Sequence, residues 1–79
     1  MLFRSVRTLE RYLDDRQDDR DAYFYAVQWF YTVHSAGAVV HSRAEDVRRA
    51  HEYADAYART RGPQMALVKQ WVDYLDAEK

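Results

Sequence analysis

Three histidines, His34, His41 and His51, are the side chains in this 79-residue chain best suited to proton transfer or metal binding near neutral pH. Their spacing matches neither HExxH nor any other pair of metal ligands. His34 shares a helix face with apolar residues, which predicts a buried or interfacial imidazole bonded to a carbonyl or hydroxyl group. A pH-responsive or ligand role is the alternative. His51 is predicted to face solvent. We therefore predict no metal site, and the chain has no cysteine to supply a thiolate ligand.

Catalytic side chains are the next chemistry to consider. Ser5, Ser35 and Ser42 lie outside any G-x-S-x-G pattern, and Ser42 is predicted to cap a helix. Acid–base catalysis needs two carboxylates in a cleft with different environments. Every Asp and Glu is predicted to lie on a polar helix face or in a turn. The sequence therefore predicts no enzyme, no catalytic residue and no cofactor.

The acidic run over residues 14–21 has no apolar side chain and is interpreted as a turn that caps the next helix. Asp18 or Asp19 can accept hydrogen bonds from the free N–H groups of that helix. Asp21 suits its first turn, where the helix dipole is positive. A carboxylate metal site is the alternative, but a calcium loop needs a central glycine and a closing glutamate, and both are missing here.

The charged residues argue against strong nucleic-acid binding, because the net charge is −1 and the two signs are interspersed. Ten arginines against two lysines point to a high-GC bacterial or phage source. A small helical DNA-binding regulator is kept as the alternative function. In that hypothesis the phosphate contacts would come from four arginines of the third predicted helix: Arg48, Arg49, Arg59 and Arg61. A recognition helix, however, should be the second of a helix pair.

Residues 22–42 contain no Asp, Glu, Lys or Arg, although the rest of the chain carries 25 such residues. This segment holds six of the twelve aromatic residues within nine positions. Aromatic side chains and arginine dominate the energetics of protein interfaces. We therefore predict a protein-binding surface, with these candidate contact residues: Tyr25, Trp29, Tyr31, Arg48, Arg49 and Tyr53.

Apolar residues recur at helical spacing along almost the whole chain, and strand alternation is not sustained anywhere. The pattern predicts four helices, over about 3–16, 20–36, 43–61 and 64–77, with the fourth shorter than the others. We expect an all-α bundle that forms one domain over residues 1–79. The second helix is apolar around most of its circumference, which is typical of a helix enclosed by its neighbours, so it is predicted to be central.

Local signals fix the ends of these helices. Gly37 is predicted to end the second helix. Ser42 and Glu45 have the spacing of a capping box, which predicts the start of the third. Val47, Ala50, Ala54, Tyr57 and Ala58 are expected to form its inward stripe. Pro63 suits the first position of the fourth helix.

The uncharged segment is long enough to cross a bilayer, but its polar residues and its lack of leucine and isoleucine argue against a membrane span. No apolar stretch follows Arg4 and Arg7 in the manner of a signal peptide, so the expected location is the cytoplasm. We predict a small, non-enzymatic protein-binding or regulatory factor of phage or bacterial origin. We also expect it to form a homodimer through the second or fourth helix.

Overall fold

A computed structural model describes residues 5–16 and 19–77, and within them it contains four α-helices and no strand. The helices are α1 (Val6–Asp15), α2 (Arg20–Ser35), α3 (Arg43–Arg59) and α4 (Met65–Ala77). The predicted all-α bundle is confirmed. So is the central place of α2, which packs against each of the other three helices.

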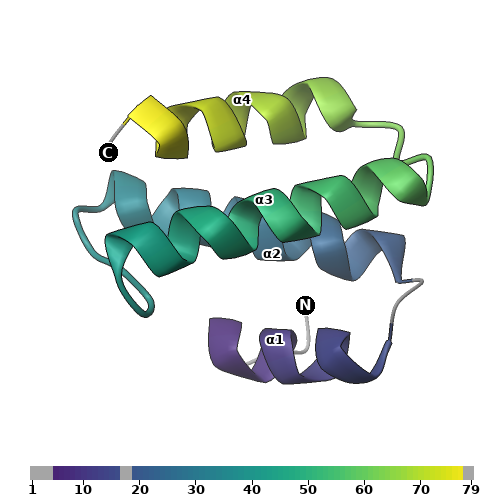
Figure 1. The fold of residues 1–79 in the computed structure, drawn as a ribbon, viewed down its shortest axis with the longest axis horizontal. Helices are drawn as coiled ribbons and strands as arrows, with labels where there is room; N and C mark the ends of the chain where they lie inside the picture. Colours follow the sequence, from purple (N-terminus) through teal and green to yellow (C-terminus); the bar gives the residue numbers. More distant parts are fainter. Residues whose placement is uncertain (1–4, 17–18, 78–79) are drawn as a thin grey trace.

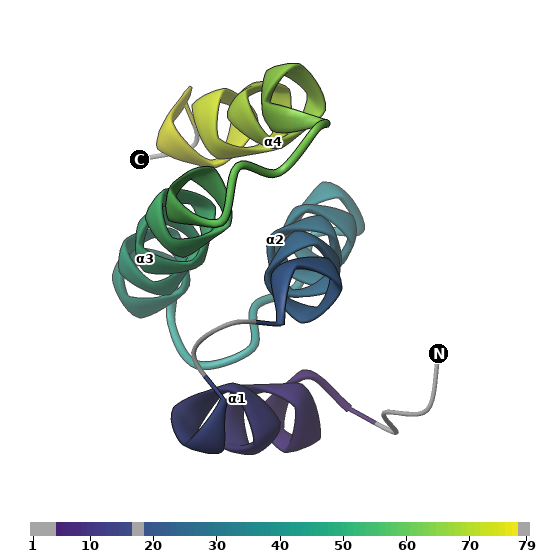
Figure 2. The ribbon, with the colours of Figure 1, turned by 90° about the vertical axis from the view of Figure 1, so that its right-hand side faces the viewer.

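The helices form a compact stack in which α2 and α3 lie side by side, α1 lies below them and α4 above them (Figures 1 and 2). Helices α2, α3 and α4 all pack against one another, whereas α1 packs against α2 alone among the described elements. The molecule is therefore a three-helix unit to which α1 is joined mainly by its packing against α2.

The shortest helix is α1, with 10 residues, and not the fourth as expected. Helix α1 begins late because Ser5 caps it: the Ser5 Oγ accepts a hydrogen bond from the Thr8 N–H at 3.3 Å. The predicted start at residue 3 lies outside the described residues. At the other end of the chain, α4 begins at Met65, two residues after Pro63.

The buried apolar side chains of the four helices form a single cluster. Four of the five residues predicted for the α3 stripe are buried and the fifth, Ala58, is exposed. Asp46, Tyr53 and Ala56 are buried in addition. Gln28, Thr32 and Ser35 form the exposed polar edge of α2. In the described part of the chain, the helices lack the combination of length and apolar character that a bilayer crossing requires.

Two of the predicted helix caps are present. The Asp19 Oδ1 accepts from the Ala22 N–H at 3.1 Å at the start of α2, and the Ser42 Oγ accepts from the Glu45 N–H at 3.1 Å at the start of α3. The alternative cap, Asp18, lies outside the described residues. Each cap satisfies an N–H group that the first helical turn leaves without a partner.

Gly37 ends α2 as predicted, with a φ of +83°. The Gly37 N–H donates to the His34 carbonyl at 3.0 Å, and the Ala38 N–H donates to the Val33 carbonyl at 3.1 Å. This pair of hydrogen bonds is the Schellman motif, which needs a left-handed residue at the position of Gly37.

Helix α3 ends in the same motif, but an arginine occupies the left-handed position. Arg61 has a φ of +58°, its N–H donates to the Ala58 carbonyl at 3.0 Å, and the Gly62 N–H donates to the Tyr57 carbonyl at 3.1 Å. The prediction that α3 extends to residue 61 is therefore too long by two residues. Gly62 is needed for a different reason: a Cβ atom there would lie 2.1 Å from the Cζ of the buried Tyr57 ring.

Substitutions at the left-handed positions of the two Schellman motifs, Gly37 and Arg61, should have opposite effects on stability. Arg61→Gly removes a side chain from a left-handed residue and should raise the free energy of unfolding by about 1 kcal/mol, whereas Gly37→Ala should lower it by about the same amount. Urea denaturation followed by circular dichroism measures both changes. A destabilised Arg61→Gly protein would contradict the assignment of strain to Arg61.

Candidate functional site

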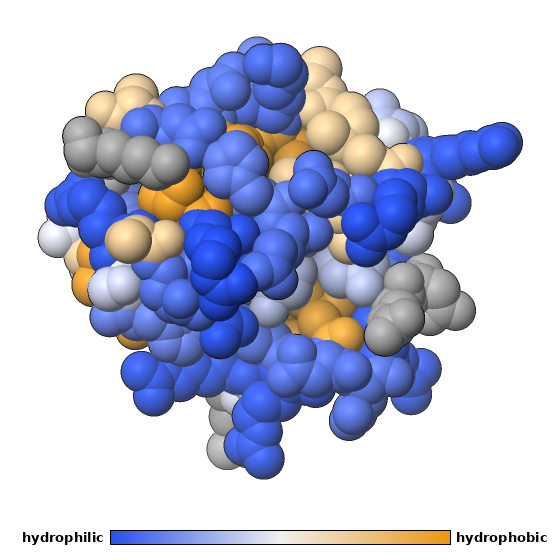
Figure 3. Space-filling model, in the orientation of Figure 1, coloured by the Kyte–Doolittle hydropathy of each residue, from blue (hydrophilic) through white to orange (hydrophobic). Residues whose placement is uncertain are grey.

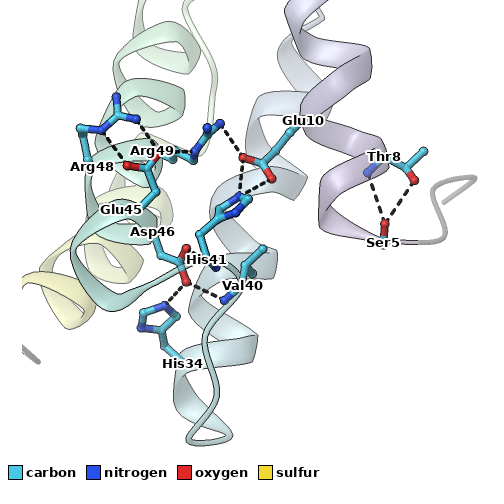
Figure 4. Close-up of polar contacts among 10 residues, drawn as sticks. All are labelled: Ser5, Thr8, Glu10, His34, Val40, His41, Glu45, Asp46, Arg48 and Arg49. Carbon is cyan, nitrogen blue, oxygen red and sulfur yellow. Dashed lines mark hydrogen bonds and ion pairs between the residues drawn. The ribbon is translucent and has the colours of Figure 1, made fainter.

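The most completely buried polar group among the described residues is the carboxylate of Asp46, in the first turn of α3 (Figure 4). Its Oδ2 accepts from the Val40 N–H at 2.7 Å and lies 2.8 Å from the His34 Nε2, and its Oδ1 accepts from the His41 N–H at 2.9 Å. The side chains of Asp46 and His34 are both 0% exposed. One carboxylate therefore fixes the end of α2 and the connector between α2 and α3.

Two opposing effects act on the pKa of Asp46. Burial disfavours the ionised carboxylate and by itself would raise the pKa, but the hydrogen bonds from His34 and from the N–H groups of Val40 and His41 together outweigh it. The net pKa is lowered from its ordinary value, so the carboxylate is ionised in the folded protein at neutral pH.

A second carboxylate, Glu10 of α1, is 5% exposed. Its Oε1 lies 2.9 Å from the His41 Nε2, and its Oε2 accepts from the Arg49 Nη1 at 2.7 Å. Arg49 also donates from Nε to the Glu45 Oε2 at 2.7 Å. His41 therefore joins the two clusters, because its backbone binds Asp46 and its side chain binds Glu10 (Figure 4).

These clusters correct two expectations from the sequence. Asp46 and Glu10 are buried, so not every carboxylate lies on a polar face or in a turn. His34 is buried as expected, but its bond at Nε2 is to a carboxylate and not to a carbonyl or hydroxyl group. His51 lies outside these clusters and is exposed as predicted, and its Nε2 lies 2.8 Å from the Asp76 Oδ1 of α4.

The buried pair of His34 and Asp46 has the residue types of an acid–base dyad but not its accessibility. Neither side chain has exposed surface, and the His34 Nε2 is occupied by Asp46. A substrate therefore cannot reach either group in this conformation. Among the described residues, no cluster of three or more His, Cys, Asp or Glu side chains is arranged to hold a metal ion.

A row of five aromatic rings runs along the seam between α2 and α4, and we call it the aromatic row. Its members, in order of contact, are Tyr25, Phe24, Trp71, Tyr31 and Tyr74. Successive ring centroids lie 6.0, 5.1, 6.0 and 5.1 Å apart. The row carries no charged side chain, and the tyrosines at its two ends are 41% and 40% exposed.

The six predicted contact residues do not form one surface. Tyr25 and Tyr31 belong to the aromatic row, with Tyr25 exposed and Tyr31 half-buried. Trp29 is half-buried against the hydrophobic core. The other three lie on α3. Their contacts are described next.

The α3 candidates are engaged within the chain. Arg48 pairs with Glu45 at 2.5 Å and with Glu52, and Arg49 pairs with Glu45 and with Glu10. Tyr53 is only 9% exposed. Burial, followed by the negative charge of Glu10, raises the pKa of Tyr53 to about 12, so its phenol group stays neutral.

The burial of these two carboxylates could have been predicted from their positions in the sequence. Glu10 lies four residues after Val6 and three before Leu13, so it belongs to the apolar stripe of α1. Asp46 lies four residues before Ala50 and seven before Tyr53, on the buried face of α3. A carboxylate on an apolar stripe must be paired, because burying an isolated charge is costly.

A polar groove separates the end of α1 from α3, with a volume of about 520 Å³. Figure 3 shows this face of the molecule, which is mostly hydrophilic. The groove is lined by residues of α1, α2 and α3: Leu13, Asp14, Tyr23, Glu52, Tyr53, Asp55, Ala56 and Arg59. Helices α1 and α3 are thus not in close contact along this border.

Comparison of this chain with protein-family models, with curated proteins and with solved structures finds no match. What can be said of its function therefore comes from the residues and the geometry described above.

Removing the Asp46 charge should show how much that charge contributes to the free energy of unfolding. Because the folded-state pKa of Asp46 is lowered, its contribution is fully present above its unfolded pKa of about 3.9 and disappears as the pH falls through the folded value. Asp46→Asn should therefore lower the free energy of unfolding at pH 7 by about 2–4 kcal/mol. The difference from the wild type should begin to shrink as the pH falls to about 4, near the unfolded pKa, and should continue to shrink at lower pH.

Urea denaturation over this pH range measures the effect. Asp55→Asn, an exposed position on the same helix, is the matched control and should change stability by less than about 0.5 kcal/mol. A difference between the wild type and Asp46→Asn that stays constant with pH would show that the Asp46 charge is not the stabilising feature.

Proposed function

We propose that this protein is a small, non-enzymatic binding or regulatory factor that works in the cytoplasm by docking on another protein, and that the aromatic row is the docking surface. The observation that carries the proposal is the continuity of the five rings, with an exposed tyrosine at each end. Tyrosine and tryptophan are the residues most enriched at the energetic centres of protein interfaces. Gln28, beside the row on α2, supplies an exposed amide for hydrogen bonds at its margin.

The DNA-binding alternative has less support from the contacts of the arginines. Phosphate binding would require Arg48 and Arg49 to exchange their carboxylate partners for phosphate, and both are held in ion pairs by Glu45. The Glu10 carboxylate, which Arg49 also binds, would lose one of its partners in that exchange. The protein-docking proposal needs no such rearrangement.

Site-specific photo-crosslinking tests the docking surface. A photoreactive phenylalanine analogue placed at Tyr25 or Tyr74 should crosslink the same partner protein in cells of the source organism. Placed at Arg48, on α3, it should not crosslink that partner. Mass spectrometry of the crosslinked products identifies the partner, and an equal yield from all three positions would reject the aromatic row as the docking surface.

The proposal includes self-association in the absence of the partner, because two copies can then bury the aromatic row symmetrically without placing like charges opposite each other. Light scattering after size exclusion should then give twice the 9.4 kDa monomer mass at micromolar concentration. Tyr31→Ala should shift the protein toward the monomer, whereas Arg48→Ala should not. A mass of 9.4 kDa for the wild type throughout this range would remove the dimer from the proposal.

A further inference from the structure

Helix α1 combines a short length with an unfavourable charge distribution. It has 10 residues, fewer than the roughly 12–15 that an isolated helix needs to be even marginally stable in water. Its first turn has no acidic residue, and its last turn has no basic residue but contains Asp14 and Asp15 near the negative end of the dipole. Helix α1 therefore depends on its contacts with the rest of the molecule.

Those contacts are of two kinds. Val6, Leu9 and Leu13 are buried in the common core, where α2 is the helix against which α1 packs. The second kind of contact is polar. The Glu10 carboxylate accepts a hydrogen bond from the Arg49 Nη1 of α3 at 2.7 Å, and it lies 2.9 Å from the His41 Nε2 of the connector. Beyond Leu13, the polar groove separates α1 from α3.

From these contacts we propose that α1 is a displaceable helix that covers an interaction surface, and that Glu10 is the group that holds it closed. We call the covered surface the α1 seat. It consists of the apolar face of α2 with Tyr23 and Tyr53 beside it, and of the two donors that bind Glu10, His41 and Arg49.

The chemistry of the α1 seat specifies its partner. The seat fits an amphipathic helix with apolar residues at i, i+3 and i+7 and a carboxylate at i+4, which is the pattern of Val6, Leu9, Leu13 and Glu10. The apolar residues would replace the α1 stripe, and the carboxylate would keep Arg49 paired. Helix-in-groove binding of this kind recognises apolar side chains that lie along one face of the bound helix.

This surface differs from the aromatic row, because α1 and α4 lie at opposite ends of the stack (Figures 1 and 2). The proposal therefore does not rest on the aromatic row being a docking surface.

Hydrogen–deuterium exchange of the full chain tests the opening of α1. Glu10→Gln keeps the shape of the side chain but weakens its bonds to Arg49 and His41. It should speed the exchange of α1 amides by about 10- to 100-fold, the loss expected for charge-assisted hydrogen bonds, and leave α3 and α4 amides unchanged. Glu52→Gln, which removes an exposed carboxylate that pairs with Arg48, is the matched control and should leave α1 exchange unchanged. Equal acceleration in all four helices would overturn the proposal, because α1 would then open only with the whole fold.

A labelled peptide that copies residues 5–16 tests the seat itself. It should bind the Glu10→Gln protein more tightly than the wild type, since the weakened α1 competes less with it. Replacing the peptide's own glutamate with glutamine should weaken its binding by about 10-fold or more. A failure to bind, or an affinity that does not depend on the peptide's carboxylate, would overturn the partner assignment.

Discussion

The ionised carboxylate of Asp46 is the constraint on which the arrangement of α2 and α3 depends. A buried charge is tolerated only if its hydrogen-bonding capacity is filled, and here the partners come from the end of α2 and from the connector. The carboxylate therefore fixes the path of the chain over residues 36–42, where no regular secondary structure would do so. Gly37 allows the sharp exit from α2, and Asp46 fixes the direction that the chain takes afterwards.

The rest of the polar structure follows from this placement. With its backbone held by Asp46, His41 directs its side chain toward Glu10, and the Glu10 carboxylate also receives Arg49. Glu10 is therefore buried next to a side chain, His41, whose backbone is held in place by Asp46. The two polar clusters thus help to fix the position of α1 relative to α3 through the connector. They act in addition to the packing of the apolar helix faces.

Local rules were enough to predict most of the fold. Helical periodicity identified all four helices, and short-range signals placed Gly37, Ser42 and Asp19 correctly, because each acts on neighbours within four residues. The end of α3 was predicted two residues too far, because Arg61 occupies a left-handed position that usually selects glycine. The glycine lies one position later, at Gly62, where the close approach of the Tyr57 ring leaves no room for a side chain.

The candidate site was harder to predict, because its partners are distant in the sequence. Glu10 and His41 are 31 residues apart, and Glu10 and Arg49 are 39 apart, so no local pattern pairs them. Two members of the aromatic row, Tyr25 and Tyr31, were among the contact residues predicted from the sequence. Their connection through Trp71 depends on how α4 lies against α2, and periodicity does not determine that.

The packing of each helix against its neighbour in the sequence has a consequence for the speed of folding. Three of the four helix–helix contacts join consecutive helices, and only that between α2 and α4 skips one. Short loops close at little entropic cost, and topologies built from such local contacts fold within microseconds to milliseconds. The hairpin of α2 and α3 is the natural nucleus, because its contacts are the most extensive. A newly made chain would thus bury its uncharged aromatic segment soon after residue 59 is available, before that segment could associate with other unfolded chains.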